Sequence, residues 1–360
     1  MKKVLIINTI GFGYEGISNV ILNYCRFMNK DGIELHIVCY SDTAESVVSI
    51  AKENAIVHRI ISRKKKCIKY LKDLNALLRV GFDTIHINGN SATMCLETLL
   101  AKGHGINNII VHGHSTSTNH PVINRLLRPL LIYTSDVRLA CSNSAGNFLY
   151  KNADYKVLNN AIDTERFAFN EKKRELIRKK LGITNQVIIG NVGYFSDNKN
   201  QYYLLGILAE IRKKLDAKIL FVGNYFDNVQ FKRAVHELKI ETDVIIVPAT
   251  SEVDLYYNAM DMFAFPSKFE GLGLVMIEAQ ANGLPCIASK GVPKAGNLTG
   301  GVRYIDLNDK EKWVESVLRT LLSLNEKKRD ETSIKNCELI AAKGFDIKHE
   351  TELLRKEYMR

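Results

Sequence analysis

The chain has 360 residues, 46% of them hydrophobic and only 6 of them proline, which excludes a disordered protein and allows two compact domains. It carries 50 lysines and arginines against 39 aspartates and glutamates, so its net charge of +11 favours an anionic partner. Nucleic acid is not the partner we expect, because the basic clusters lack interleaved aromatic residues and no recognised nucleic-acid motif occurs.

The cysteines and the first residues indicate the compartment. The 7 cysteines include no C-x-x-C pair and mostly lie within apolar runs, which is typical of buried thiols in a reducing compartment. The opening MKKVLIINT holds too short an apolar run for a signal peptide, and no stretch approaches the ~18 apolar residues of a spanning helix. We therefore expect a cytoplasmic protein.

The first half of the chain alternates short apolar segments with helix-length amphipathic ones. The apolar segments read as strands, at residues 4–8, 34–40, 55–60, 84–88, 108–113, 137–142 and 155–160. Each is followed by a helical stretch, such as ISNVILNYCRFMNK, so the pattern predicts a parallel sheet with crossover helices.

A second series with the same alternation follows a charged helical stretch at residues 165–181. Its strands are expected at residues 186–193, 217–223, 243–248, 262–267, 285–289 and 302–307. The two series predict an α/β protein with two Rossmann-like parallel-sheet domains, residues 1–165 and 166–342. Paired domains of this kind present the carboxyl ends of both sheets to one interdomain crevice, where ligands bind.

Gly11, Gly13 and Gly16 form a G-x-G-x-x-G pattern after the first expected strand. A nicotinamide-binding interpretation is disfavoured, because two extra residues follow the strand and the first acid after the second strand, Asp42, comes late for a ribose contact. The favoured interpretation is a tight turn whose backbone approaches an anion. Gly16 then opens a helix whose first N–H groups would face the crevice.

The stretch FEGLGLVMIEAQANGLPCIAS, residues 269–289, places Glu270 and Glu278 around two glycines and an apolar run. Gly271 and Gly273 allow close approach of a ligand, and the helix that starts there offers an N-terminal anion site. Glu278, about two turns into the helix, could accept two hydrogen bonds from vicinal ribose hydroxyls. Its apolar neighbours disfavour the alternative, a solvent-facing helix residue. The stretch therefore predicts a nucleotide-sugar site.

This stretch resembles the E-x7-E signature of the retaining glycosyltransferases of family 4, which have the GT-B fold. The match includes both glutamates and the residues Gly271, Gly273, Ala279, Gly283 and Pro285. The resemblance implies that Glu278 binds the ribose and Glu270 contacts the transferred sugar. It further implies that sugar hydroxyls and phosphate are held by backbone N–H groups of Gly271, Leu272 and Gly273.

A second family element, GRxxxxKN, reads GYFSDNKN here, so Lys199 is retained and Tyr194 replaces the arginine. The resemblance implies that Lys199 neutralises the donor diphosphate, while Tyr194 can donate a hydrogen bond but no charge. Additional positive charge could come from nearby lysines: Lys268, Lys290 and Lys294, the last of which stands where the family usually has Glu.

The candidate chemistry of the N-terminal domain is VHGHSTS, residues 111–117. The resemblance implies a histidine here that contacts the donor sugar, and His114 fits the motif better than His112. A structural role for His114 stays open, and His86 reads as buried structure. No D-x-D and no cluster at metal-ligand spacing occurs, so we expect no metal cofactor.

The resemblance implies a metal-independent retaining glycosyltransferase. It would move a hexose or N-acetylhexosamine from a nucleotide sugar, with UDP as the favoured nucleotide, to an exopolysaccharide, capsular or lipid-linked acceptor. In such enzymes a C-terminal helix, here about residues 343–360, crosses back to the first domain. Two alternatives stay open: a nucleotide-sugar epimerase on a GT-B fold, and a non-catalytic nucleotide-sugar-binding protein.

Two basic features raise the hypothesis of peripheral attachment to the inner face of the cell membrane. One is the RKKK run at residues 63–66, and the other is VINRLLRPLLIY, residues 122–133, which pairs Arg125 and Arg128 with a leucine-rich face. An ordinary core-facing helix is the alternative for the second feature.

Overall fold

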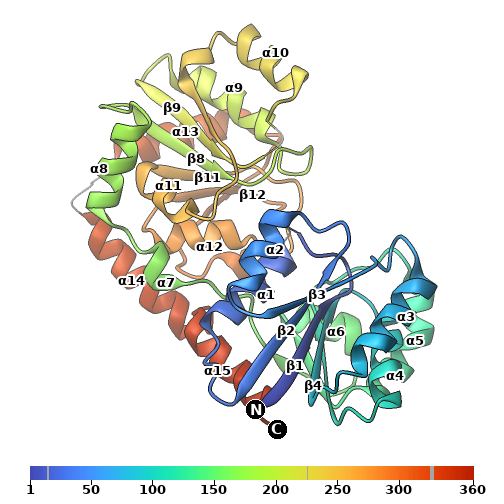
Figure 1. The fold of residues 1–360 in the computed structure, drawn as a ribbon. Coiled ribbons are helices and arrows are strands. Elements are labelled where there is room, and N and C mark those ends of the chain that lie inside the picture. Colours follow the sequence, from blue (N-terminus) through green and yellow to red (C-terminus); the bar gives the residue numbers. More distant parts are fainter. Residues whose placement is uncertain (14–15, 225, 325–327) are drawn as a thin grey trace. The chain divides into compact units, whose positions relative to one another are not determined.

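The computed structural model describes residues 1–13, 16–224, 226–324 and 328–360 (Figure 1). The chain divides into two compact units. The first unit contains Met1–Ala161 together with Gly344–Arg360, and the second contains Ile162–Lys343.

The first unit is built on a seven-stranded sheet with the order β3-β2-β1-β4-β5-β6-β7, in which every neighbouring pair is parallel. The strands are β1 Lys2–Asn8, β2 Ile33–Tyr40, β3 Ile56–Ile60, β4 Thr84–Gly89, β5 Asn108–Gly113, β6 Val137–Ala140 and β7 Lys156–Val157. Strands such as β1 are covered on both faces, which explains their continuous apolar runs. The strand order reverses between β1 and β4, where such sheets bind ligands at the carboxyl ends.

The first unit has helices on both sides of this sheet (Figure 1). They are α1 Gly16–Phe27, α2 Glu45–Lys52, α3 Cys67–Leu78, α4 Cys95–Gly103, α5 Pro121–Thr134, α6 Asn143–Tyr150 and α15 Ile347–Tyr358, with a 3-10 turn η1 at Ala92–Met94. The last helix, α15, packs against α1. Its Tyr358 hydroxyl lies 2.7 Å from Nδ1 of His86 on β4, and the side chain is 1% exposed. Helix α15 is therefore part of this unit's core.

The second unit has a six-stranded parallel sheet with the order β10-β9-β8-β11-β12-β13. The strands are β8 Val187–Val192, β9 Ala217–Val222, β10 Val244–Val247, β11 Met262–Phe265, β12 Cys286–Ser289 and β13 Arg303–Ile305. Its helices are α7 Thr164–Phe167, α8 Glu171–Lys180, α9 Gln201–Ile211, α10 Val229–Glu237, α11 Val253–Ala259, α12 Leu274–Ala281, α13 Lys310–Leu322 and α14 Arg329–Ala342, with 3-10 turns η2 Glu241–Asp243 and η3 Lys294–Gly296. The two parallel sheets confirm the predicted α/β architecture.

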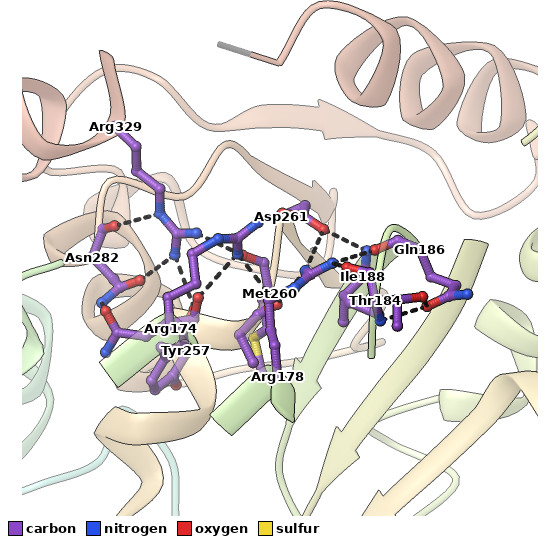
Figure 2. Close-up of polar contacts among 12 residues, drawn as sticks. Arg174, Arg178, Thr184, Gln186, Ile188, Tyr257, Met260, Asp261, Asn282 and Arg329 are labelled. Atoms are coloured by element: carbon purple, nitrogen blue, oxygen red, sulfur yellow. Dashed lines mark hydrogen bonds and ion pairs between the residues drawn. The ribbon is translucent and has the colours of Figure 1, made fainter. Parts of the chain in front are cut away.

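Three arginines hold the carboxyl end of α11 in the second unit (Figure 2). Arg174 of α8 and Arg178 bond the two carboxylate oxygens of Asp261 at 2.6 and 3.2 Å. Together with Arg329 of α14 they also donate to the last carbonyls of α11 and the residues after it, those of Tyr257, Asn258, Ala259 and Met260. Cations complement the negative end of a helix dipole, so this arginine cluster fixes α11 in place.

None of the helices in the described parts of the chain is long and apolar enough to cross a membrane.

Candidate functional site

Lys199 and Glu270 lie in the loops that follow two neighbouring parallel strands, β8 and β11. Their charged groups form an ion pair, with Nζ of Lys199 2.7 Å from Oε1 of Glu270. The two side chains are 17% and 11% exposed. The Lys199 ammonium also lies 5.4 Å from the centre of the Phe265 ring, in a cation–π contact. The structure therefore brings together two residues that the sequence motifs selected separately.

Hydrogen bonds join the two loops. The amide of Lys268 donates to the carbonyl of Asn198 at 2.7 Å, and the Asn198 side chain donates to the carbonyl of Phe269 at 2.8 Å. Asn200, just before α9, adopts a left-handed φ of 57° and donates from its side chain to the carbonyl of Pro266. These hydrogen bonds fix the position of Lys199 relative to Glu270. Asn198 takes part in two of them, a role that the motif spacing did not predict.

The glycines Gly271 and Gly273 shape the start of α12. Gly273 is the N-cap residue with φ of +81°, and a Cβ there would lie 2.9 Å from Cε1 of Phe265. Glycine is required at this position on both counts. The amides of Met276 and Ile277 donate to the carbonyl of Gly273, which makes them the first hydrogen bonds of the helix. The amides before Met276 therefore lie ahead of the helix's own hydrogen bonds, where they can donate to a ligand. Open space at the Gly271 Cβ position leaves room for a ligand here, where an anion is favoured.

Glu278 lies on α12 and is held by Tyr257 of α11. The Tyr257 hydroxyl is 2.7 Å from Oε2 of Glu278 and 3.0 Å from the carbonyl of Val275. Burial raises the pKa of the Glu278 carboxyl to about 7, although the Tyr257 hydrogen bond and the Arg166 charge oppose that increase. Near neutral pH the carboxyl is therefore poised between its charged and neutral forms.

Sequence reasoning missed Tyr257, which lies 21 positions before Glu278. The arginine cluster bonds the Tyr257 carbonyl, so the cluster fixes the backbone that carries this hydroxyl (Figure 2). No sequence motif marks Tyr257, and its role is revealed only by its hydrogen bond from α11 to α12.

Tyr194 and the other candidate lysines lie in the loops that follow β8, β11 and β12. Tyr194 follows β8, is 52% exposed, and accepts a hydrogen bond at its carbonyl from the Gln201 side chain. Lys268 is exposed, Lys290 pairs with Asp306 at 3.2 Å, and Lys294 is exposed on η3. Among these lysines, Lys199 is the one with an ion pair to Glu270.

His114 follows β5 in the first unit. Its Nε2 lies 2.9 Å from Oδ1 of Asn88, whose Nδ2 donates to the carbonyl of Ile7. Because Asn88 presents its oxygen, His114 donates from Nε2. Burial lowers the pKa of His114 to about 4, so its imidazole is neutral at physiological pH. The His112 ring, 1% exposed, lies 4.0 Å from the His114 ring, and burial lowers its pKa as well.

Gly16 is the first residue of α1, as the sequence predicted, and it is exposed. The turn before it is anchored by Ser18, whose Oγ accepts hydrogen bonds from the Gly13 amide and from the Asn8 side chain. Asn8 pairs in register with Asn88, the partner of His114. The start of α1 and His114 thus lie at one edge of the first sheet, while residues 14 and 15 of the glycine motif lie outside the described residues.

Within the ranges that the structure describes, no group of three or more His, Cys, Asp or Glu side chains is arranged to hold a metal ion.

Two family models match the chain. The model described as Glycosyltransferase Family 4 matches residues 14–166, and the model described as Glycosyl transferases group 1 matches residues 173–335. Together they span most of the chain.

Two curated proteins resemble the chain over nearly its whole length. One, from Bacillus subtilis (strain 168), is named as the glycosyltransferase EpsF, is 25% identical over 378 residues, and is matched over 99% of this chain and 96% of its own. The other is the UDP-Gal:alpha-D-GlcNAc-diphosphoundecaprenol alpha-1,3-galactosyltransferase of Escherichia coli, 24% identical, with 96% of this chain and 94% of the relative covered.

Solved structures show the same fold. HepE of Anabaena in complex with UDP and glucose has a TM-score of 0.77 at 16% identity, with 99% of each chain covered. A glycosyltransferase from Rickettsia africae has a TM-score of 0.79 at 15% identity, with 99% of this chain and 97% of that chain covered. At such identities the likeness shows the fold alone, and that fold is GT-B.

Proposed function

Since the chain belongs to the family 4 glycosyltransferases and is a sugar-transferring enzyme, we propose that it transfers a sugar from a UDP-sugar with retention of the anomeric configuration. The transferred sugar is a hexose or an N-acetylhexosamine. The acceptor is a growing surface polysaccharide or a lipid-linked glycan.

The observation that carries this proposal is the Lys199–Glu270 ion pair beside the start of α12. A sugar diphosphate has one end that needs a cation and helix N–H groups, and another end that offers hydroxyl donors. Lys199 and the amides of Gly271, Leu272 and Gly273 suit the first end, and Glu270 suits the second. Glu278, held by Tyr257, suits the ribose hydroxyls, and Tyr194 can donate to the phosphate.

Roles in the first unit follow from the same chemistry. His114 is neutral, because burial lowers its pKa to about 4, and a neutral imidazole can hydrogen-bond a sugar hydroxyl without adding positive charge. Gly16 leaves the start of α1 open to a ligand, since none of the described atoms outside its own helix would lie within 4 Å of an added Cβ. Both residues are proposed donor contacts.

In the proposed reaction, the bond from C1 of the sugar to the diphosphate oxygen breaks and a bond to the acceptor oxygen forms on the same face. The acceptor proton passes to the departing phosphate. Lys199 stabilises the charge that develops on the leaving group, and Glu270 holds the sugar in position. Lys199 and Glu270 pair with each other, so a bound donor would share Lys199 with Glu270.

We propose that no metal cofactor takes part, because Lys199 and the start of α12 supply the positive charge that a diphosphate needs. The UDP donor is supported by the Escherichia coli relative, named for UDP-Gal, and by the HepE structure with UDP and glucose. The name of the first also supports a lipid-linked acceptor. A cytoplasmic enzyme attached peripherally to the inner face of the membrane would meet such an acceptor, and it could serve exopolysaccharide or capsule synthesis.

The proposal is tested by thermal shift with the glucose conjugates of UDP, GDP and ADP. A ligand at about 100 times its Kd stabilises the folded state by ~2.7 kcal/mol, so UDP-glucose should raise Tm the most. Glu278→Ala should remove that increase, whereas Glu237→Ala, an exposed residue of α10, should retain it. No shift with any nucleotide sugar would contradict the proposal.

The same sample separates the alternatives. A nucleotide-sugar epimerase would convert the donor without an acceptor. A binding protein would be stabilised by UDP but would convert no donor. A transferase releases UDP in proportion to the glycosylated acceptor, which chromatography of both products measures.

A further inference from the structure

Helix α5 carries apolar side chains on its solvent side. Val122, Leu126 and Tyr133 are 69%, 72% and 86% exposed, and Ile123 is 46% exposed. The buried residues of α5 are Leu131 and two polar residues, Asn124 and Thr134. A core-facing helix, the alternative that the sequence left open, therefore accounts for Leu131 but not for these four side chains.

The spacing of Val122, Leu126 and Tyr133 places these three exposed residues on one stripe. Val122 and Leu126 are four positions apart, and Tyr133 follows seven positions later, so they align along one side of the helix. The inward side is fixed by hydrogen bonds, because Oδ1 of Asn124 accepts from the amide of Ala92 at 2.6 Å. Rotating the helix to hide the stripe would break this buried contact.

The helices beside α5 extend the apolar face. Helix α4 packs against α5, and α3 packs against α4, on one side of the first sheet (Figure 1). Ile68 at the start of α3 is 75% exposed, and Leu99 of α4 is 42% exposed. We call the outer side of these three helices, with the preceding residues 63–66, the α3–α5 face.

The exposed charge of the α3–α5 face is positive. Its exposed basic residues are Lys64, Lys65, Lys66, Lys69, Lys72 and Arg125. Among the described residues of α3, α4 and α5 the acids are Asp73 and Glu97. Beside residues 63–66, Asp42 pairs with Lys65 at 3.2 Å, which leaves the other lysines to set the sign of the face. Glu97 is 0% exposed and binds Arg63 at 3.0 Å, so it neutralises a partner within the fold instead of the surface lysines.

We propose that the α3–α5 face docks on an anionic lipid bilayer, with the α5 stripe entering the interface and the lysines contacting phosphate headgroups. Exposed apolar residues next to lysine and arginine are the combination that interfacial helices use. A second copy of this chain fits less well, because an isologous contact would place the same positive charges opposite each other. The inference adds a partner to the proposed function, where a lipid-linked acceptor would lie.

The test is co-sedimentation of the full chain with vesicles of phosphatidylcholine, with or without phosphatidylglycerol. Binding to the anionic vesicles should exceed binding to the neutral ones at low salt and should weaken as salt rises. The double variant Val122→Asp, Leu126→Glu should bind the anionic vesicles at least about tenfold more weakly, because both substitutions remove apolar contact and add negative charge.

The matched control is Leu176→Glu, Val229→Glu, which places the same kind of change on residues that are 62% and 81% exposed in the second unit. It should sediment like the parent chain, and all forms should share one Tm. Equal binding by the α5 double variant, or no preference for anionic vesicles, would overturn the proposal. A dimer in sedimentation velocity that the α5 double variant abolishes would assign the face to a second copy instead. These vesicles contain no sugar acceptor, so the result is independent of whether the proposed transfer occurs.

Discussion

At the scale of single residues, Glu278 links the electrostatics of the site to a measurable pH dependence. Burial raises its pKa to about 7, and only the ionised carboxylate can accept two hydrogen bonds from ribose hydroxyls. Between about pH 6 and pH 8 the ionised fraction rises about tenfold, so UDP-glucose should bind up to about tenfold more tightly at the higher pH. Isothermal titration calorimetry measures this, and Glu278→Gln should bind weakly at both pH values.

The stability of the ligand-free protein should change in the opposite sense. A carboxyl whose pKa is raised from 4.5 to about 7 in the folded state binds more protons than in the unfolded state between these values. Its contribution therefore favours folding below this window and is lost as pH rises through it. Glu278→Gln should flatten the decrease of Tm across the window, and an identical pH profile in the variant would contradict the assigned burial.

Lys199 is the residue on which the leaving-group argument depends. Removing one positioned electrostatic donor typically lowers kcat by about 10²- to 10³-fold, and we expect this of Lys199→Ala. The control is Lys213→Ala, an exposed lysine of the same unit that pairs with Glu210 of α9. Steady-state kinetics should show the loss mainly in kcat, because the charge of the diphosphate grows as it departs. Full activity in Lys199→Ala would mean that another group neutralises the diphosphate.

At the scale of elements, the arginine cluster is expected to stabilise the second unit strongly. Arg174→Ala leaves Asp261 buried with one cation fewer and should cost about 3–5 kcal/mol. Arg233→Ala, which removes an exposed pair with Glu237, should cost below about 0.5 kcal/mol. The chain's one tryptophan, Trp313, is buried in the core of this unit, so its fluorescence during urea unfolding reports both values. Equal midpoints for the two variants would contradict the role of the cluster.

Helix α15 should stabilise the first unit through the packing of its apolar side chains. Leu354 is 1% exposed, and Leu354→Ala should cost about 2–5 kcal/mol through lost packing. Because Trp313 belongs to the second unit, circular dichroism should show an earlier loss of helix while the tryptophan transition keeps its midpoint. A shift of the tryptophan transition without a separate earlier phase would argue against α15 as an element of the first unit's core.

At the scale of the whole molecule, the strands were predictable because runs such as Val4–Ile7 are buried on both faces of a parallel sheet. The β7 prediction, residues 155–160, was too long, because only Lys156 and Val157 pair with β6 at the sheet edge. The motifs implied that Lys199 contacts the diphosphate and Glu270 the transferred sugar of one donor, but they did not predict that the two side chains form an ion pair. Their loops come together because β8 and β11 are neighbouring strands, and only the structure reveals this strand order.

The remaining features could not be read from the sequence for physical reasons. The Tyr257 hydroxyl reaches Glu278 through helix packing, and packing leaves no fixed spacing along the chain. Periodicity showed that α5 is amphipathic, but a buried hydrogen bond from Ala92 to Asn124 decides which side faces inward. The apolar stripe therefore became visible only with the contacts of the fold.

Retaining transfer of sugar without a metal is tested most directly by NMR of the product formed from an α-linked UDP-sugar in EDTA. We expect an α-linked product at the same rate with or without EDTA, because Lys199 and the start of α12 supply the positive charge. A β-linked product, or activity lost in EDTA and restored by Mg²⁺ or Mn²⁺, would contradict it.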